Sequence, residues 1–243
     1  MLFALGDAAE TEGLAARVVP CRVGQIGPIL VTLAEESIRH VVLAGRIWKD
    51  GLFHGMTLDG PGGAVLGRSP DWTDAGLLGA VARTLDDLGI VLMDQRRFLG
   101  PWLAAAGVLA GPPPPDSACA DIDQGLAIAR VLARHGVGQT VVVRAGTVAA
   151  VEAMEGTDEA IRRGLGLAGP GAVVIKAIGP VHDYRFDTPA VGPVTLGVCA
   201  AGGASALAIE AGRVLLLDLA TVEAHAAQAG ISVVGFPGES VAP

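Results

Sequence analysis

Two acidic segments in the second half of the chain hold the residue types that phosphate chemistry requires. The first covers residues 152–158, the second covers residues 182–189, and each follows an apolar stretch. Loops that follow strand ends are the places where a scaffold presents reactive side chains. We therefore expect the two segments to converge on one metal-assisted phosphate site.

The second segment ends in Thr188-Pro189, and a residue before proline favours extended backbone. In an extended chain alternate side chains point the same way, so Asp183, Arg185 and Asp187 should line one side. Such a row could supply carboxylate oxygens to Mg²⁺ or Mn²⁺ and a guanidinium group to a phosphate. From the residues alone, a structural row of salt bridges is the favoured interpretation, because networks of ion pairs resemble functional sites.

In the first segment, a glycine followed by Thr157 and Asp158 is typical of a helix start. These two residues could satisfy the free backbone N–H groups of that helix. Alternatively, the helix N-terminus could form a cradle for an anion, with Glu152 and Glu155 orienting water or a metal ion. Lys176 interrupts a run of Val and Ile, so it either reaches solvent from a strand end or faces an anion.

Several common catalytic motifs are absent from the sequence. The five histidines lack zinc-ligand spacing, no G-x-G-x-x-G follows the first expected strand, and there is no G-x-S-x-G. The formal net charge of −8 disfavours nucleic acid and argues against a polybasic membrane patch. A substrate that carries phosphates would therefore need a metal ion or a local group of cations.

Cysteine usage and hydropathy favour a cytoplasmic protein. The three cysteines are scattered without metal-ligand spacing, which suits reduced thiols. The first residues lack the basic and apolar regions of a signal peptide. The longest apolar region, residues 196–217, is interrupted by Gly202-Gly203, Glu210 and Arg213, so we expect no membrane span.

The first half of the chain alternates between apolar, strand-like runs and amphipathic helices. The run 40–44 is apolar enough for a strand buried on both faces, whereas residues 46–71, with Gly-Pro-Gly-Gly at 60–63, should form a loop. The alternation predicts an α/β, Rossmann-like domain with a parallel sheet over residues 1–111. Its other strands are expected at 2–5, 17–19 and 90–93, and its helices at 25–36 and 74–88, the latter capped by Thr73.

Four consecutive prolines mark the expected domain boundary, with a linker over residues 112–116, because they cannot donate ladder hydrogen bonds. Residues 117–243 should then form a second, mixed α/β domain of the catalytic type. Asp121 or Asp123 should cap its first helix. Residues 140–143 and 147–151 should form a hairpin, with strands at 173–178, 194–199, 213–219 and 231–235 and helices from 157 and at 221–229.

The order of these motifs resembles a bacterial family, the UDP-2,3-diacylglucosamine pyrophosphatases of lipid A biosynthesis that are not metallophosphoesterases. The resemblance is specific over residues 117–236, and residues 23–27 and 41–45 are similar to the first domain of that family. It is carried by the runs 121–123, 138–143, 151–158, 183–192 and 209–213 and by Lys176.

The resemblance implies Mg²⁺-dependent hydrolysis of UDP-2,3-diacylglucosamine to UMP and 2,3-diacylglucosamine 1-phosphate, with Mn²⁺ as the other candidate cation. A hard cation would neutralise the diphosphate and activate a water molecule. Asp187 would be a metal ligand or would orient water, because it matches the acid of the family's Arg-x-Asp-x-Pro motif. The resemblance further implies Asp183 and Glu155 as catalytic acids, Asp158 as a second metal ligand, and Lys176, Arg185, Thr157 and Gly45 as substrate-binding residues.

The beginning of the chain departs from the family pattern. Residues 6–10 replace a longer glycine-rich loop, and His182 stands where the family usually has glutamine. Because the N–H groups of a glycine-rich loop bind phosphate, a second hypothesis stays open: a non-catalytic paralogue that binds lipid or nucleotide. The resemblance also implies peripheral contact with the inner membrane, from which the acyl chains are delivered, and leaves a homo-oligomer open.

Overall fold

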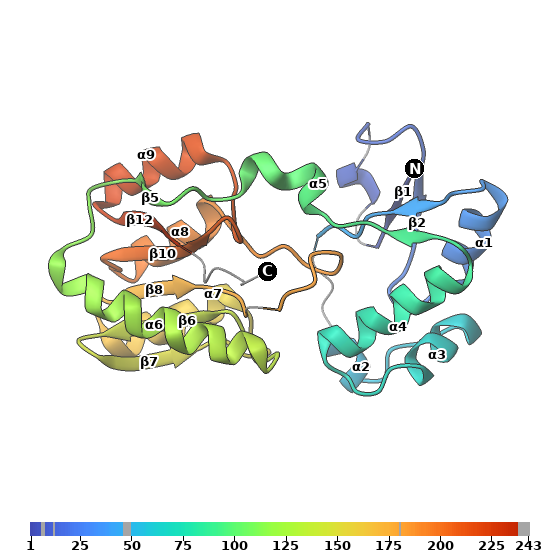
Figure 1. Ribbon diagram of the computed structural model, residues 1–243, viewed down its shortest axis with the longest axis horizontal. Helices are drawn as coiled ribbons and strands as arrows, with labels where there is room; N and C mark the ends of the chain where they lie inside the picture. The colour runs from blue at the N-terminus through green and yellow to red at the C-terminus, as the bar shows by residue number, and fades with distance from the viewer. Residues whose placement is uncertain (6–7, 12, 46–49, 180, 238–243) are drawn as a thin grey trace. The chain divides into compact units, whose positions relative to one another are not determined.

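The computed structural model describes residues 1–5, 8–11, 13–45, 50–179 and 181–237. Contacts within the chain divide it into two compact units, residues 1–95 and residues 96–243 (Figure 1). Each unit combines helices and strands, which confirms the α/β class expected from the sequence. In the described part of the chain, no helix is both long and apolar enough to pass through a membrane.

The described residues of the first unit contain two pairs of parallel strands. β1 (Leu2–Ala4) lies beside β2 (Val18–Pro20), and β3 (His40–Val41) lies beside β4 (Val91–Leu92). Parallel pairing agrees with the sequence pattern, but two separate pairs do not establish a Rossmann-like sheet, which stays a prediction. The helices of this unit are a 3₁₀ turn (Ala8–Thr11), α1 (Gly27–Glu35), α2 (Asp50–Phe53), α3 (Gly60–Gly67) and α4 (Asp74–Asp87).

Two local predictions for this unit are wrong. The run at 60–63 begins α3 rather than a turn, because Asp59 accepts a hydrogen bond from Gly62 N (2.6 Å) and proline suits the first helical turn. The run at 40–44 is not buried on both faces. Among the described strands, β3 has β4 as its one neighbour, and Val42 is 39% exposed.

The second unit is built on one six-stranded mixed sheet with the order β5-β12-β10-β8-β6-β7. Strands β8, β10 and β12 run parallel. The β6–β7 hairpin lies antiparallel to β8, and β5 lies antiparallel to β12 at the opposite edge. The strands are β5 (Gly107–Ala110), β6 (Thr140–Arg144), β7 (Thr147–Val151), β8 (Val173–Lys176), β10 (Ala206–Ala211) and β12 (Ser232–Pro237).

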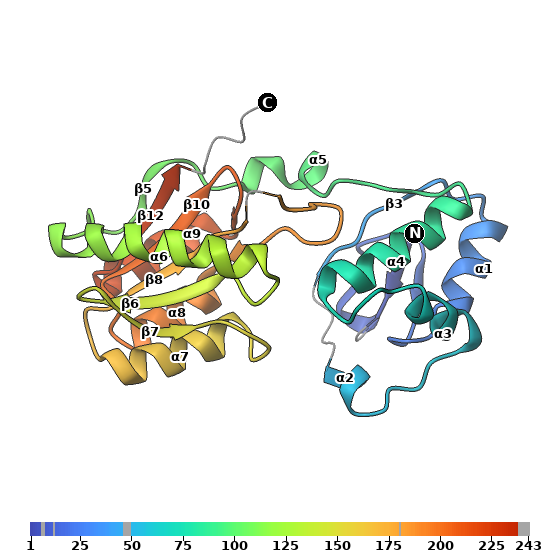
Figure 2. The ribbon, with the colours of Figure 1, turned by 60° about the horizontal axis from the view of Figure 1, so that its bottom comes forward.

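Helices cover both faces of this sheet (Figures 1 and 2). On one face α6 packs its apolar stripe, including Ile122 and Leu126, against Val141 and Ile175. On the other face α7, α8 and α9 enclose a second core that includes Val174. These helices are α6 (Asp116–Arg134), α7 (Thr157–Ala168), α8 (Pro193–Ala201) and α9 (Leu219–Ala229), and the unit also contains α5 (Arg96–Leu99), a 3₁₀ turn (Gly100–Trp102) and the parallel pair β9 (Ala190–Val191) and β11 (Leu215–Leu216).

The division between the units differs from the predicted linker at 112–116. It falls between Gln95 and Arg96, and the proline run lies inside the second unit, where it joins β5 to α6. Pro115 is the N-cap residue of α6. A proline at a helix start leaves no extra hydrogen bond unmade, because the first N–H groups of a helix have no partner in the helix. The prolines therefore start a helix instead of separating domains.

Other differences in the second unit also have local causes. Residues 194–199, predicted as a strand, belong to α8. Residues 206–211 form β10, a strand that was not predicted from their Ala-rich sequence. Asp121 does not cap α6. It lies inside that helix, and its carboxylate accepts hydrogen bonds from Ala145 N (2.8 Å) and Gly146 N (2.7 Å) in the hairpin turn. A predicted cap thus joins a helix to the neighbouring hairpin.

Candidate active site

The candidate site lies in the second unit, at the carboxyl end of β8. Lys176 is the last residue of that strand, and its antiparallel neighbour β6 begins opposite it with Thr140. The chain then returns through residues 181–189 to β9 and α8. Ligands of open α/β sheets bind outside the carboxyl ends of the strands. The topology therefore places both acidic segments where the sequence analysis expects chemistry.

Lys176 is buried and linked through a hydroxyl to Glu152. Its side chain is 5% exposed, and Nζ donates a hydrogen bond to Thr157 Oγ1 (2.8 Å). Thr157 Oγ1 donates in turn to Glu152 Oε1 (2.9 Å). A buried ammonium group is costly unless an acceptor and an opposite charge compensate it, and Thr157 and Glu152 supply these. Lys176 therefore does not reach for solvent from the strand end.

Thr157 begins α7 without capping it through its side chain. The N-cap residue is Gly156, with a φ of 83°, and the helix has no side-chain hydrogen bond at its cap. The predicted cap role of Thr157 and Asp158 is therefore wrong. The Thr157 hydroxyl serves the chain from Lys176 to Glu152 instead.

Gln139 extends this chain to Asp187 and is a residue that sequence reasoning did not assign to the site. Its backbone N donates to Glu152 Oε2 (3.2 Å), and its side-chain Nε2 donates to Asp187 Oδ2 (3.3 Å). Gly138 permits this packing, because a Cβ atom there would lie 2.2 Å from Glu152 O. The sequence signal is weak, since Gln139 merely precedes an apolar strand. Asp187 and Lys176 thus belong to one hydrogen-bonded group.

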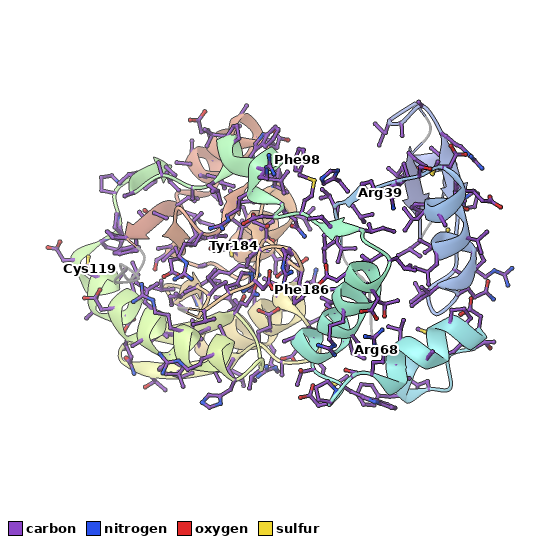
Figure 3. The ribbon with its side chains drawn as sticks, turned by 45° about the vertical axis from the view of Figure 1, so that its right-hand side comes forward. Arg39, Arg68, Phe98, Cys119, Tyr184 and Phe186 are labelled. Carbon is purple, nitrogen blue, oxygen red and sulfur yellow. The ribbon has the colours of Figure 1, made fainter. Side chains whose placement is uncertain are left out.

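Asp183, Arg185 and Asp187 do not form the predicted extended row. Phe186 N donates to Asp183 O (3.0 Å), so the chain turns at residues 183–186 (Tyr184 and Phe186 are labelled in Figure 3). Arg185 donates to Asp183 Oδ2 through Nη2 (2.7 Å) and to Oδ1 through Nε (3.0 Å). These hydrogen bonds lower the pKa of Asp183, although burial opposes them. Asp187 instead is exposed and held by the neutral amide of Gln139.

Glu155 is paired with an arginine, like Asp183. Its carboxylate accepts from Arg163 Nη2 and from Ala153 N (3.1 Å). Burial pushes the pKa of Glu155 up, but the hydrogen bonds and the charge of Arg163 outweigh it, so this pKa lies below its ordinary value. The catalytic roles proposed for Asp183 and Glu155 remain predictions, and both carboxylates already have a cationic partner.

Asp158 faces α8, one residue beyond Thr157. Its Oδ1 accepts a hydrogen bond from Thr195 Oγ1 (3.3 Å). Cys199, one turn further along α8, has its pKa raised to about 12 by burial first and by the charge of Asp158 second. Such a thiol stays protonated and unreactive. Asp158 therefore lies beside the hydrogen-bonded group that contains Thr157, and it could contribute oxygens at its margin.

A bound Mg²⁺ would fit these residues if phosphates helped to hold it. Within the described residues, no group of three or more His, Cys, Asp and Glu side chains gathers around one point. Mg²⁺, however, is usually bound by one or two carboxylates, with substrate phosphates and waters as its other ligands. Asp187 and Asp158 carry oxygens of this kind and have neutral hydrogen-bond donors. Either carboxylate could therefore offer oxygen ligands to a cation that arrives with a diphosphate.

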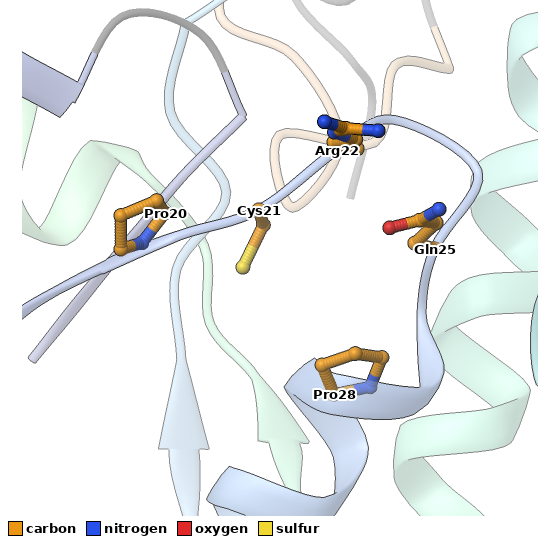
Figure 4. A pocket seen from close by; sticks show the side chains of 5 residues that line it. All are labelled: Pro20, Cys21, Arg22, Gln25 and Pro28. Atoms are coloured by element: carbon orange, nitrogen blue, oxygen red, sulfur yellow. The ribbon is translucent and has the colours of Figure 1, made fainter.

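The first unit holds Gly45 and a small cavity, each described within that unit alone. Gly45 has a φ of 84°, which favours glycine, and a Cβ atom there would meet no atom within 4 Å. The cavity has a volume of about 360 Å³ and lies between the end of β2 and the start of α1 (Figure 4). The residues that line it are Pro20, Cys21, Arg22, Gln25 and Pro28.

The N-terminus of α1 beside this cavity is already occupied by a carboxylate. Asp59 Oδ2 accepts from Gly27 N (2.8 Å), and Asp59 Oδ1 caps α3. Burial raises the pKa of Asp59, but the backbone hydrogen bonds of Gly62 and Gly27 lower it further, so the group stays ionised. The departure from the family pattern at residues 6–10 lies partly outside the described residues; Ala8–Thr11 form a 3₁₀ turn.

Comparison with known proteins assigns both halves of the chain to one family. Residues 1–102 match the model of the LpxI N-terminal domain, and residues 105–234 match that of the LpxI C-terminal domain. The chain is also 32% identical over 226 residues to the UDP-2,3-diacylglucosamine pyrophosphatase LpxI of Caulobacter vibrioides, covering 88% of this chain and 80% of that protein. The candidate site lies within the matched C-terminal domain. The chain therefore belongs to the LpxI family.

Proposed function

We propose that this chain hydrolyses the pyrophosphate bond of UDP-2,3-diacylglucosamine and releases UMP and 2,3-diacylglucosamine 1-phosphate in lipid A biosynthesis. One observation carries the proposal: a relative named for this activity matches 88% of the chain at 32% identity. The geometry supports it, because a buried lysine, a hydroxyl group and an exposed carboxylate belong to one hydrogen-bonded group at the carboxyl end of β8.

Hydrolysis of a phosphoanhydride requires neutralisation of charge on the phosphate oxygens and a correctly placed water molecule. In our proposal Lys176 and Thr157 hold phosphate oxygens beside the start of α7, where the helix dipole favours negative charge. The exposed Asp187 carboxylate orients the attacking water and accepts its proton. Mg²⁺, or Mn²⁺ in its place, would be held by Asp187 and Asp158 and would neutralise the diphosphate and acidify a bound water.

The remaining assignments follow from the same proposal. Arg185 and Gly45 contribute to substrate binding. Asp183 and Glu155 contribute to catalysis as carboxylates that are each paired with an arginine. The two acyl chains of the substrate come from a membrane, so we propose a cytoplasmic protein that visits the inner-membrane surface and binds no nucleic acid. A homo-oligomer is compatible with this scheme.

The competing hypothesis is a non-catalytic paralogue that binds the lipid or the nucleotide, and it is favoured by the departure at residues 6–10. The test is release of radiolabelled UMP from UDP-2,3-diacylglucosamine in mixed detergent micelles. We expect turnover that stops with EDTA and returns with added Mg²⁺ or Mn²⁺. Binding of the substrate without any UMP release would reject hydrolysis and support the paralogue. Full turnover in EDTA would reject the requirement for a metal ion and would leave the proposed hydrolysis intact.

A further inference from the structure

A cluster of largely buried ionic side chains, Glu210, Arg130 and Arg213, lies next to the candidate site. Glu210, near the end of β10, is 0% exposed. Its Oε1 accepts from Arg130 Nη2 (3.0 Å) and Nε (3.2 Å), and it lies 3.6 Å from Arg213 Nη1. A buried carboxylate with two arginine partners is retained at a large desolvation cost. Well-packed apolar side chains could fill the same space without this cost, so the contacts of the cluster indicate its role.

The cluster fixes the segment that leads from β8 to Asp187. Glu210 Oε2 accepts a hydrogen bond from Ile178 N (3.0 Å), directly after the strand. Arg213 Nη2 donates to Gly179 O (2.6 Å), and Arg213 Nε donates to the Tyr184 hydroxyl (3.4 Å). Two side chains therefore hold this segment at three places. None of these contacts touches the acids proposed for catalysis.

Tyr184 connects this cluster to Asp187 through the neighbouring His182 ring. The Tyr184 and His182 rings meet in a T-shaped arrangement, with centroids 4.8 Å apart. Arg96 Cζ lies 3.8 Å from the centre of the Tyr184 ring. Nε2 of His182 donates to the backbone oxygen of Asp187 (2.9 Å). The backbone of Asp187 is thereby fixed by His182, while its carboxylate is fixed by Gln139. The two hydrogen bonds together restrain the direction of that carboxylate.

We propose that Glu210 and Arg213 are positioning residues, which act through Tyr184 and His182 to aim the Asp187 carboxylate at the attacking water. The inference rests on the proposed hydrolysis. It predicts that loosening the cluster lowers the rate of the chemical step more than it weakens substrate binding. A misplacement of about 1 Å at a reacting group can cost about 100-fold in rate.

The closing experiment compares Arg213→Lys, Tyr184→Phe and wild type by the kcat and KM of UMP release. Arg213→Lys keeps the charge but loses the planar fork that reaches Gly179 and Tyr184 together. We expect its kcat to fall about 10- to 100-fold with KM changed less than about 2-fold. Tyr184→Phe removes one hydroxyl contact, so a loss below about 10-fold is expected. Asp87→Asn, which breaks the exposed pair with Arg68, is the control and should match wild type.

Two further measurements separate positioning from general damage. In the Asp187→Asn background, Arg213→Lys should cause little additional loss, because both changes act on the same carboxylate. Hydrogen exchange should speed up in residues 181–189 of Arg213→Lys but not in β6, and the thermal midpoint should fall by only a few degrees. Glu210→Gln is the stronger variant, and its folding can be checked in the same way.

Each outcome bears on a definite claim. An active wild type with a fully active Arg213→Lys, or a loss confined to KM, overturns the positioning role and leaves the hydrolase proposal intact. If Arg213→Lys lowers kcat by the same factor in the Asp187→Asn background as in wild type, the positioning role is also rejected. The cluster would then act on a group other than Asp187. If the wild-type protein releases no UMP, the proposed hydrolysis is rejected. The positioning role of the cluster is then rejected as well, whatever the pattern of hydrogen exchange.

Discussion

The acidic segments 152–158 and 182–189 each hold one carboxylate that is paired with an arginine, and their other acids accept hydrogen bonds from neutral donors. Glu155 pairs with Arg163 and Asp183 pairs with Arg185, whereas Glu152 and Asp187 accept from hydroxyl or amide groups. An arginine partner neutralises a carboxylate and fixes it, whereas a neutral donor orients a carboxylate without neutralising it. The sequence does not distinguish these acids from one another, whereas their hydrogen-bond partners do.

The largest expected effect is a difference between the two acids of the second segment. Asp187→Asn should lower kcat for UMP release about 10²- to 10⁴-fold, because the carboxylate that we propose to orient water loses its charge and its basicity. Asp183→Asn should cost less than about 10-fold, since Asp183 already neutralises Arg185. Steady-state kinetics with thermal unfolding as a folding check would measure both. Equal losses for the two variants would end the distinction between paired and unpaired acids.

The buried chain of the first segment should respond in stability as well as in activity. Lys176→Met removes the cation that compensates Glu152, so we expect unfolding to become easier by about 1–3 kcal/mol, along with loss of phosphate binding. Adding Glu152→Gln should restore part of that stability without restoring UMP release. Urea unfolding of the four proteins in this cycle would measure the coupling. Strict additivity in stability would show that Lys176 and Glu152 do not compensate each other.

Local signals predicted the elements whose cause is local. Thr73 caps α4 as expected, and the glycine turn at 145–146 closes the predicted hairpin. Elements set by tertiary context were missed. β10 has a single β-branched residue, Ile209, and forms because it lies between β8 and β12. The apolar run 194–199 matches a strand pattern, but Pro193 begins a helix there.

In the candidate site, the sequence likewise indicates which residue types are present but not which residues they contact. The residue types at Lys176, Thr157 and Asp187 could be chosen from the sequence and its family likeness. Their partners could not, because Gln139 reaches Asp187 across 48 positions and Thr157 meets Lys176 across 19. The preference of a residue before proline for extended backbone applies to Thr188 alone. It therefore could not predict the turn in which Arg185 donates to Asp183. Spacing along the chain thus identified acids but not which of them an arginine neutralises.

A smaller effect is expected at Gln139, the neutral donor of the second segment. Gln139→Leu should lower kcat about 10-fold, because Asp187 loses the amide that orients it while its charge is unchanged. Gln139→Glu should be worse, since it places a like charge beside Asp187. Kinetics at saturating substrate would measure both losses. An active Gln139→Leu protein would show that the neutral donor is not what distinguishes Asp187 from Asp183.

The smallest effect concerns the two arginine-paired acids and the dependence of stability on pH. The pKa of Asp183 is lowered by hydrogen bonds from Arg185 against burial, and that of Glu155 is lowered by Arg163 in spite of burial. A carboxyl group with a lowered folded-state pKa stabilises the fold above its ordinary pKa, and this stability is lost as the pH falls through the lowered value.

Asp183→Asn and Glu155→Gln should therefore lower stability at pH 7 by about 0.2–1 kcal/mol each, because both pairs are partly exposed. The difference from wild type should shrink as the pH drops below the ordinary carboxyl range. Urea unfolding between pH 7 and pH 3 would measure it, with Glu159→Gln, from the exposed pair with Arg162, as the matched control. A difference that stays constant with pH would show that arginine pairing does not set the ionisation of these two acids, and the contrast with Asp187 would then need another cause.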